Sequence, residues 1–483
     1  MRQSVRLGWA GAGFDYACGV PISPLPNFVE PSRYMTADLK GIGGFIKQRS
    51  EDFLVEEIPA YDPTGEGEHL YLMVQKAGLS TLGMVALIAR HFGVRESAVG
   101  YAGLKDKHAI TRQAVTVHVP GKKPEDFPQL VHPKLVVLGA VMHANKLRRG
   151  HLRGNRFVIK VRGTPATGVI TAQKVLTRLE AEGMANRLGE QRFGHGGNNH
   201  EIGRSILLGD FDSACDQLIA PAGDIRPEHV LAQEHYFAGR YLDALNLMPV
   251  GAETESAVLR TLIRGGSREK AVKSIGRAAA SFYATSFQSA IFNKLLEDRL
   301  SAGTLATLEL GDLAFKHDNT AVFAVDEATL AEPTLAERVA KFEVSPSGPM
   351  WGPSMKRATG AVAAREDLAL AETGVTPEHL EKFAEQVSEG VAGKRRALRV
   401  RVMYPQVEGG VDEFGSYVKC SFELPAGSFA TVVMREMIKP AAGAGIEDPH
   451  RRFGGVPGGG AAGGGGPEGP VGRGDGGEVD SGE

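Results

Sequence analysis

The sequence is poor in cysteine and has no long apolar run. Among its 483 residues there are three cysteines, Cys18, Cys215 and Cys420, too few for a disulfide framework and without the spacing of a zinc site. No apolar run approaches the roughly 20 residues of a membrane span, and the first twenty residues lack the continuous apolar core of a secretory signal. These absences disfavour secreted and membrane classes and predict a cytoplasmic protein.

The common cofactor and catalytic motifs are missing as well. The chain has no GxxxxGK[ST] phosphate loop, no HExxH and no GxSxG, and Gly11 and Gly13 do not complete a dinucleotide fingerprint. The fourteen histidines show no ligand spacing such as i,i+4 pairs. The sequence therefore gives little support to a metal site and indicates no cofactor.

Hydrophobic residues make up 42% of the chain and charged residues 23%, which is ordinary for a globular protein. The length suggests two to four domains. The net charge of −2 averages unlike regions, because residues 441–483 carry −4 and the remainder +2. This last segment is rich in glycine and has too little apolar content to fold, so we predict a disordered tail.

One stretch is strongly basic. Seven cations and no acid lie between residues 139 and 163, which is a plausible phosphate footprint. The alternative is a solvated strand pair with basic outer faces. The seven residues are Lys146, Arg148, Arg149, Arg153, Arg156, Lys160 and Arg162.

Hydrophobic periodicity predicts a mixture of helices and half-buried strands. Ser80 offers an N-cap for a helix that ends at Gly93, and a second helix runs from about 172 to 182. Two i,i+4 apolar rows predict a broadly buried helix around 287–300. Period-2 runs at 114–119, 156–162, 398–402 and 418–424 predict strands. Without a βαβ rhythm, this indicates an α+β protein with a largely antiparallel sheet.

Asp106 is the most unusual acid in the sequence. It lies in the segment 100–109 (GYAGLKDKHA), between a predicted helix and a predicted strand, and is crowded by Lys105, Lys107 and His108. Nearby cations favour the carboxylate form, which suits a nucleophile or a base and not a general acid. The alternative is an ordinary Lys-Asp-Lys turn.

Two further segments are candidates for function. Residues 186–199 combine glycines, planar amides and arginines, the chemistry of phosphate and base-edge contact, or else form a plain domain-boundary loop. In residues 424–431, Gly427 and Ser428 predict a turn and an N-cap before an amphipathic helix that ends at Ile438, so a structural role is favoured.

Six segments in a fixed order resemble the TruD-type tRNA pseudouridine synthases. The resemblance covers about residues 41–440, and its most specific block is YAGLKDKHAITRQ at 101–113. The chain departs from the family at Arg187-Leu188, where the family often has an aromatic pair. The other blocks are 45–57 (FIKQRSEDFLVEE), 146–157 (KLRRGHLRGNRF), 188–194 (LGEQRFG), 286–293 (SFQSAIFN) and 424–436 (LPAGSFATVVMRE).

The resemblance implies a pseudouridine synthase fold, with a bent, mainly antiparallel sheet and an inserted α/β domain specific to this branch. Residues 1–35 are then an irregular lead-in, and residues 36–198 with 395–440 are a discontinuous catalytic domain. Residues 199–394 are the inserted domain and 441–483 the tail.

By the same resemblance Asp106 is the catalytic aspartate. Lys47, Phe53, Lys105, Asn155 and Phe157 match substrate-binding positions, with Lys47 pairing with Asp106 and Phe157 stacking on the target base. Phe157 also alternates with Ile159 and Val161, so a core position is the competing interpretation. The expected RNA phosphate contacts are Lys146, Arg148, Arg149, Arg153 and Arg192.

The implied reaction converts a uridine of tRNA, at position 13 of the D-arm, to pseudouridine. This isomerisation needs no cofactor or metal, and tRNA is the expected partner of a chain taken as a monomer by default. The target base must leave its stack and be held against an aromatic or apolar surface. Two alternatives stay open: a catalytically inactive RNA-binding protein of the same fold, and a nucleoside hydrolase or glycosylase.

Overall fold

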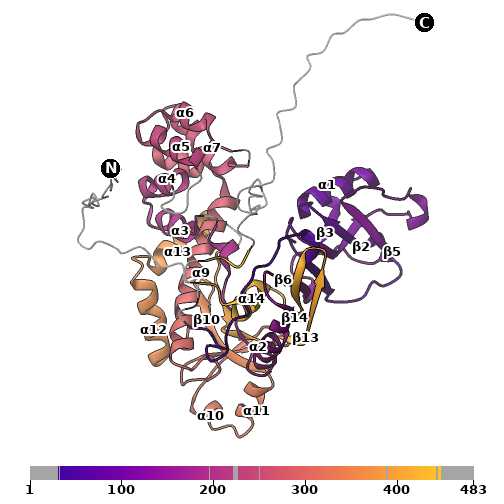
Figure 1. Cartoon of the computed structure of the whole chain (residues 1–483). Helices are drawn as coiled ribbons and strands as arrows, with labels where there is room; N and C mark the ends of the chain where they lie inside the picture. Colours follow the sequence, from indigo (N-terminus) through magenta and orange to yellow (C-terminus); the bar gives the residue numbers. More distant parts are fainter. Residues whose placement is uncertain are drawn as a thin grey trace, which may run out of the picture.

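A computed structural model of the chain describes residues 31–447, apart from 32, 195, 221–226, 250, 388–389 and 442–443. The predicted lead-in up to residue 30, and His195 of the segment 186–199, lie outside the described residues. A large sheet with flanking helices lies beside a second, mainly helical part (Figure 1). The α+β class predicted from the sequence is confirmed.

The large sheet has eight strands and joins both ends of the described chain. Its order is β13-β14-β6-β1-β4-β2-β5, and β3 pairs with β4. The β1–β4 pair is parallel, and the other strand pairs of this sheet are antiparallel. The late strands β13 and β14, drawn in orange in Figure 1, lie beside the earlier strand β6. The strands are β1 (Phe53–Pro59), β2 (His69–Ala77), β3 (Val99–Tyr101), β4 (Ile110–His118), β5 (Leu135–His143), β6 (Leu152–Arg162), β13 (Met403–Asp412) and β14 (Gly415–Pro425).

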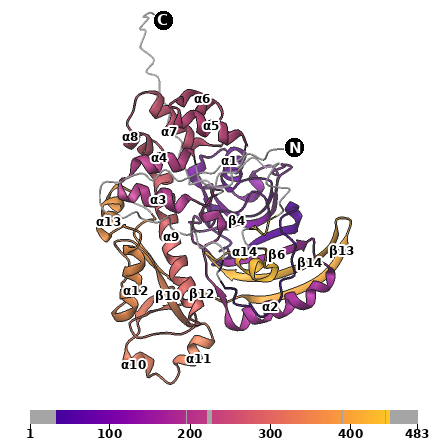
Figure 2. The same ribbon diagram turned by 60° about the vertical axis from the view of Figure 1, so that its left-hand side comes forward.

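Each end of this sheet has its own helical cover and its own hydrophobic cluster. Helix α1 (Thr81–Phe92) begins at Ser80, whose Oγ accepts a hydrogen bond from the Gly83 N–H at 3.0 Å, and ends at Gly93 with φ 66°, a left-handed conformation that glycine adopts at little cost. It packs on β2, β3 and β4. Helices α2 (Val169–Glu182) and α14 (Ala430–Ile438) cover β6, β13 and β14. Figure 2 shows α2 running alongside β13 and β14.

The second part of the molecule combines helices with a small sheet of order β11-β10-β8-β9. The pair β7 (Met184–Ala185) and β12 (Arg399–Val400) connects it with the large sheet. Its helices are α3 (Asn199–Leu208), α4 (Phe211–Ile219), α5 (Pro227–Phe237), α6 (Tyr241–Asn246), α7 (Glu253–Ile263), α8 (Arg268–Lys273), α9 (Arg277–Ser301), α10 (Glu327–Leu330), α11 (Leu335–Ala340), α12 (Gly360–Ala371) and α13 (Pro377–Gln386), and its strands are β8 (Leu313–Lys316), β9 (Val322–Ala324), β10 (Val344–Met350) and β11 (Lys394–Ala397).

Helix α9 is the central element of this second part. Its two predicted apolar rows enter different clusters: Phe287, Ile291 and Leu295 pack among the helices. Phe292, Leu296 and Leu300 pack against a cluster that includes Leu188 and Leu398 from the junction with the large sheet. One helix therefore supports both the second part and its junction.

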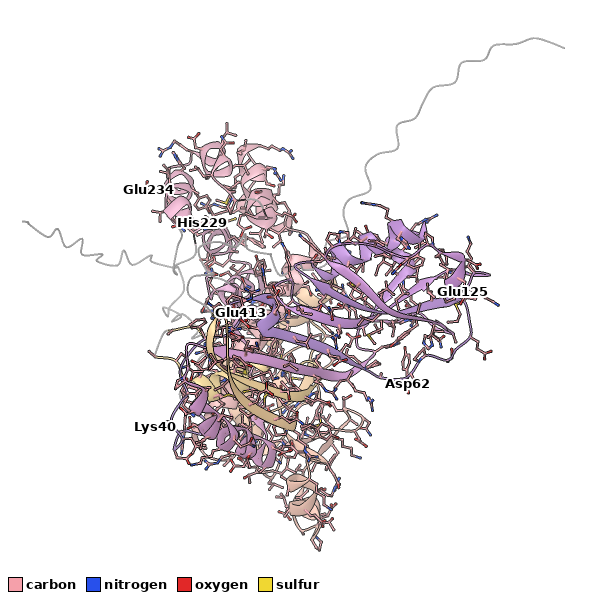
Figure 3. The ribbon with its side chains drawn as sticks, turned by 45° about the vertical axis from the view of Figure 1, so that its right-hand side comes forward. Lys40, Asp62, Glu125, His229, Glu234 and Glu413 are labelled. Carbon is pink, nitrogen blue, oxygen red and sulfur yellow. The ribbon has the colours of Figure 1, made fainter. Side chains whose placement is uncertain are left out.

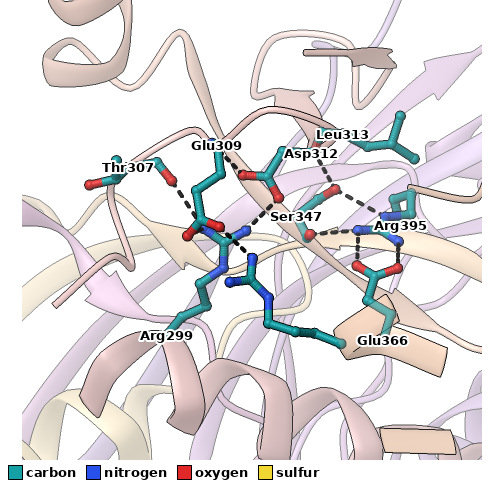
Figure 4. Close-up of polar contacts among 9 residues, drawn as sticks. Arg299, Thr307, Glu309, Asp312, Leu313, Ser347, Glu366 and Arg395 are labelled. Atoms are coloured by element: carbon teal, nitrogen blue, oxygen red, sulfur yellow. Dashed lines mark hydrogen bonds and ion pairs between the residues drawn. The ribbon is translucent and has the colours of Figure 1, made fainter. Parts of the chain in front are cut away.

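Two buried arginines of the second part are paired with carboxylates. Arg299 of α9 binds Glu309 at 2.8 Å and also Asp312, while Arg395 of β11 binds Glu366 of α12 at 2.7 Å (Figure 4). Such buried charges are tolerated because each has an opposite charge and further hydrogen bonds. The two parts of the molecule project in different directions from their junction, as the labelled Glu125 and Asp62 on one side and His229 and Glu234 of α5 on the other show in Figure 3.

Two local predictions at the end of the chain need correction. The run 398–402 is not one half-exposed strand: β11 pairs with β10, β12 pairs with β7, and Arg399 is buried with its guanidinium on the carbonyl oxygens of Glu182 and Val339. Helix α14 ends at Ile438 as predicted, but its N-cap is Phe429, and Ser428 instead lies near the Asn186 side chain.

The tail boundary predicted at residue 441 also needs correction. Ile446 is 1% exposed and packs in the cluster of β6, β14 and α2. Its carbonyl oxygen accepts a hydrogen bond from the Ile46 N–H at 2.8 Å, and Glu447 forms a bridge with Ile46. Residues 446 and 447 thus belong to the folded protein, because one apolar side chain and one charge find partners in it.

Candidate active site

Asp106 lies in the loop between β3 and β4, and its carboxylate binds Lys47. Lys47 Nζ is 2.9 Å from Asp106 Oδ2, and Asp106 Oδ1 accepts a hydrogen bond from the His108 N–H at 2.9 Å. Burial alone would raise the pKa of Asp106, but the Lys47 ammonium and the His108 N–H outweigh it and hold the pKa below its usual value. The result is an ionised, oriented carboxylate of which 23% of the side chain stays exposed.

Lys47 is held in an unusual backbone conformation between two acids. It is a non-glycine residue with φ 61°, a strained region that often marks a functional site. Its Nζ also lies 2.7 Å from Glu447 Oε1 and 5.0 Å from the centre of the Phe53 ring. Burial would lower the pKa of Lys47, but the carboxylates of Glu447 and Asp106 raise it, so the lysine stays charged.

Side chains of β2 and α1 hold the backbone of the loop that carries Asp106. Lys76 of β2 is 1% exposed, and its Nζ donates to the carbonyl oxygens of Leu79 at 2.8 Å, Asp106 at 3.0 Å and Lys105 at 3.4 Å. Thr81 Oγ1 accepts from the Lys105 N–H at 2.9 Å. Burial lowers the pKa of Lys76 to about 8. These contacts set where the Asp106 backbone lies.

The structure pairs Lys105 with a buried acid. Its Nζ binds Glu57 Oε2, and the Glu57 side chain is fully buried, with Oε1 accepting from the Ala114 N–H at 3.3 Å. A substrate contact was expected for Lys105, whereas its ammonium group is engaged by Glu57. Lys105 therefore fixes the loop beside Asp106.

Asn155 and Phe157 point to the same side of β6 because they are two residues apart. In the sheet Asn155 lies opposite Glu57 and Leu424, and Phe157 opposite Val55 and Phe422. Phe157 is 7% exposed, and its ring centre lies 6.5 Å from that of Phe53 and 5.7 Å from that of Phe422. Phe157 is thus part of the core next to the site.

Asn155 is one of several residues with a buried polar atom that has no partner among the described residues. Its Oδ1 is buried and has no hydrogen bond to any of the described residues. Leaving a buried acceptor unpaired costs roughly 1–3 kcal/mol, so such atoms in native proteins call for an explanation. An amide oxygen in this state can accept a hydrogen bond from a ligand N–H.

The basic stretch divides into two groups. Arg156, Lys160 and Arg162 are bound by Glu423, Asp412 and Asp52, and Arg162 is buried. The other four lie on the turn before β6 and at the start of that strand, where Arg153 is the second residue. Arg148, Arg149 and Arg153 are exposed and Lys146 is half-buried; Arg149 donates to Tyr101 Oη at 3.0 Å, Arg153 to the Pro59 carbonyl oxygen at 3.0 Å and Lys146 to the Ser97 carbonyl oxygen.

Arg192 lies at the junction of the two parts, away from this turn. Its Nε donates to Ser289 Oγ at 3.3 Å, and its guanidinium lies 5.2 Å from the Phe282 ring centre, both on α9. Burial lowers the pKa of Arg192 to about 10. The divergent Arg187 nearby is paired with Glu297, and Leu188 packs in the junction cluster, so the departure from the resemblance at 187–188 is accommodated by packing.

Known proteins are similar to most of this chain. A family model described as tRNA pseudouridine synthase D (TruD) matches residues 31–437. The chain belongs to the TruD family. Among named members, tRNA pseudouridine synthase D of Geobacter metallireducens is 40% identical over 409 residues, which cover 84% of this chain and 98% of that protein. That of Anaeromyxobacter sp. (strain Fw109-5) is 36% identical over 410 residues, covering 84% and 96%.

A solved structure agrees with the family and the fold. It is described as the putative tRNA pseudouridine synthase D (TruD) from Methanosarcina mazei, and it superposes with a TM-score of 0.70 at 27% identity, covering 86% of this chain and 99% of that one. The resemblance inferred from six sequence blocks is thereby confirmed, and with it the pseudouridine synthase fold. As a member of the TruD family this chain is a tRNA-modifying isomerase. In the described part of the chain, no helix has both the length and the apolar character needed to cross a membrane.

Three residues of the site were missed by sequence reasoning. Lys76 is the eighth residue of a regular strand, and Glu57 is one of two adjacent acids in another, so neither has a local signal. Glu447 lies within residues 441–483, whose overall composition predicts disorder. Only the fold brings their side chains to the loop of Asp106.

Proposed function

We propose that this protein converts uridine 13 in the D-arm of tRNA to pseudouridine, with Asp106 as the catalytic carboxylate. The observation that carries the proposal is the Lys47–Asp106 pair, in which a buried ammonium group keeps a partly exposed carboxylate ionised. An ionised carboxylate suits the first step, whether it attacks C1′ of the ribose or acts as the base that forms a glycal.

The reaction is an isomerisation, so atoms and electrons balance without a co-reactant. The C1′–N1 bond breaks, the free uracil rotates, a C1′–C5 bond forms, and the proton of C5 leaves while N1 gains one. Asn155 Oδ1, which has no partner among the described residues, is the acceptor for a uracil N–H. Phe157 and Phe53 supply the apolar surface next to it, which requires the base to displace the side chains that now cover the Phe157 ring.

The partner is tRNA, bound through Arg148 and Arg149 on the exposed turn before β6 and through Arg153 at the start of this strand. Lys146, whose ammonium group already binds the Ser97 carbonyl oxygen, lies beside them. We place the protein in the cytoplasm, where tRNA is found, and expect a monomer that works without cofactor or metal.

The test uses two tRNA transcripts, one with uridine 13 and one with cytidine at this position. Purified protein is incubated with each in the presence of a metal chelator, and pseudouridine is mapped along the RNA. We expect product at position 13 of the first transcript alone. Product at another uridine would refute the positional assignment, and binding without any product would favour the non-catalytic alternative.

The matched variants are Asp106→Asn and, as control, Asp298→Asn on the exposed surface of α9. Asparagine keeps the shape but not the charge of the catalytic carboxylate. We expect no product from Asp106→Asn, unchanged tRNA affinity, and parental activity from Asp298→Asn. Because Glu447 still pairs with Lys47, the Asp106→Asn protein should remain folded. A folded Asp106→Asn protein with a comparable rate would show that Asp106 is not the catalytic group.

A further inference from the structure

Three cations converge at the junction between the large sheet and the second part. Arg192 lies in the turn before α3, and Lys394 and Arg396 lie two residues apart on the same side of β11. Arg192 contacts α9 at Phe282 and Ser289, while Arg396 lies over the ring of Phe292, further along the same helix.

Each of these cations keeps hydrogen-bond donors that no described residue uses. Arg396 places Nε and Nη2 on the carbonyl oxygen and side chain of Asn186 and Nη2 on the Gly427 carbonyl oxygen, which leaves Nη1 unused. Arg192 uses Nε alone. Lys394 is exposed, and within the described ranges its ammonium group has no acceptor. The cluster therefore presents several N–H donors around one position.

Other arginines near this junction differ from these three cations, because each of them is paired with a carboxylate. Arg187 is bound by Glu297, Arg435 by Glu190 and Arg395 by Glu366. The carboxylates of Glu297, Glu190 and Glu366 are thus already engaged by other arginines. Burial, together with the nearby charge of Arg192, lowers the pKa of Arg396 to about 10. Partial loss of hydration, together with the charges of Arg396 and Arg192, also lowers the pKa of Lys394.

Like charges gathered without a counterion destabilise a fold unless an anion joins them. Guanidinium groups bind phosphate through two parallel N–H donors, which is why arginine is frequent in phosphate sites. The position fits such a ligand: Arg396 binds the turn at Gly427, directly after the strand in which Leu424 pairs with Asn155 of the candidate active site. An RNA strand that delivers a base to Asn155 therefore passes near this turn.

We propose that Arg192, Lys394 and Arg396 form a binding site for a backbone phosphate of the RNA, close to the nucleotide that enters the active site. This inference rests on the proposed function, because it assumes that the bound polyanion is tRNA. It assigns part of RNA recognition to β11, at the end of the second part of the molecule, in addition to the turn before β6.

The test uses Lys394→Glu, because Lys394 is exposed and its replacement leaves the hydrogen bonds of Arg396 intact. The control is Lys382→Glu on the exposed surface of α13, which makes the same change in net charge. Affinity for a tRNA transcript is measured over a series of salt concentrations, and pseudouridine is assayed on the same preparations at saturating tRNA.

We expect Lys394→Glu to weaken tRNA binding about tenfold or more, because the new carboxylate repels the phosphate, and to reduce the slope of log K against log salt by about 0.7–0.9. Lys382→Glu should bind like the parent. A series of D-arm RNAs, each with one uncharged methylphosphonate linkage at a different position, locates the phosphate. For the parent protein, affinity should fall when the linkage is at one position near the target uridine. For Lys394→Ala, the same linkage should cause no further loss of affinity.

The outcomes separate the two proposals. Equal affinities and slopes for Lys394→Glu and Lys382→Glu would refute the phosphate site, whatever the product assay shows. A parent protein that makes no pseudouridine, while Lys394→Glu still weakens its tRNA binding, would refute the catalytic proposal alone and uphold the phosphate site.

Discussion

Lys76 shows at the residue scale how a side chain can act on chemistry without touching the substrate. Its buried ammonium group donates to the carbonyl oxygens of Asp106 and Leu79, and no carboxylate of the described residues lies within hydrogen-bond distance of it. In Lys76→Met the stem remains and the donors are removed. We expect kcat to fall, by roughly 10²-fold if the carboxylate moves by 1 Å, with tRNA affinity unchanged.

Stability should respond less than activity to this substitution, because losing the buried charge offsets the carbonyl oxygens left unpaired. Single-turnover rates at saturating tRNA, together with thermal unfolding, test this. A control is Lys134→Met, an exposed lysine just before β5. If Lys76→Met melts much earlier and keeps the parental kcat, Lys76 serves stability alone.

At the element scale, we expect His317 to make the stability of the small sheet depend on pH. It follows β8, its Nε2 lies 2.9 Å from Ser345 Oγ of β10, and burial together with the nearby charge of Arg399 lowers its pKa to about 4. The unfolded chain binds this proton near pH 6.5. Stability from this group is therefore complete above about pH 6.5 and is lost as the pH falls towards 4, with a slope of at most about 1.4 kcal/mol per pH unit.

Thermal unfolding between pH 7 and pH 5 measures this dependence. In His317→Gln the amide can still bond Ser345 but does not titrate, so the decrease in melting temperature on acidification should be smaller than in the parent. His379→Gln, a substitution at the exposed start of α13, serves as control and should keep the parental pH dependence. Identical slopes for His317→Gln and the parent would contradict the assignment.

The C-terminal segment around Glu447 permits a test by truncation. Removing residues 448–483 deletes a glycine-rich, acidic stretch and should leave melting temperature and turnover nearly unchanged. Removing residues 441–483 also deletes Ile446 and Glu447. Loss of the buried Ile446 side chain leaves a cavity and should lower the free energy of unfolding by about 2–4 kcal/mol. Loss of Glu447 leaves Lys47 with one of its two carboxylate partners. The longer deletion should therefore melt earlier and turn over more slowly; equal behaviour of the two would show that residues 446 and 447 contribute nothing.

Local signals in the sequence were enough for some elements and not for others. The Ser80 cap and Gly93 end of α1, and the two apolar rows of α9, follow from spacing, because each depends on residues within a few turns. The run at 398–402 could not be assigned by alternation. There Arg399 faces inward onto carbonyl oxygens of α2 and α11, partners that lie far away in the sequence.

The candidate site divides in the same way. Asp106 and Lys47 were found through their matching blocks, and the structure brings them together although 59 residues separate them. Lys105 was named for substrate contact, which stays a prediction; its ion pair with Glu57 had no signal, because this partner is fixed by strand register rather than by a motif. Glu447 lay beyond the matched blocks altogether.

At the scale of the whole molecule, cationic groups lie on both parts: the turn with Arg148 and Arg149 on the large sheet, and the cluster at the junction. If one tRNA contacts both groups, each group displaces counterions from the phosphates that it binds. Replacing the two groups one after the other should therefore reduce the salt dependence of binding in separate steps. The double replacement Arg148→Ala with Arg149→Ala should reduce the slope of log K against log salt by about 0.7–0.9 for each phosphate that is no longer bound. Adding Lys394→Ala should reduce it further by one such step, because distant sites act additively. Affinities of several different tRNAs should fall alike, since phosphate contacts carry no base identity.

The matched control replaces the exposed Arg264 and Lys382 with alanine and should keep the parental slope. A slope that stays parental after the first pair is replaced would mean that Arg148 and Arg149 face solvent in the complex, and that the RNA binds through the junction alone.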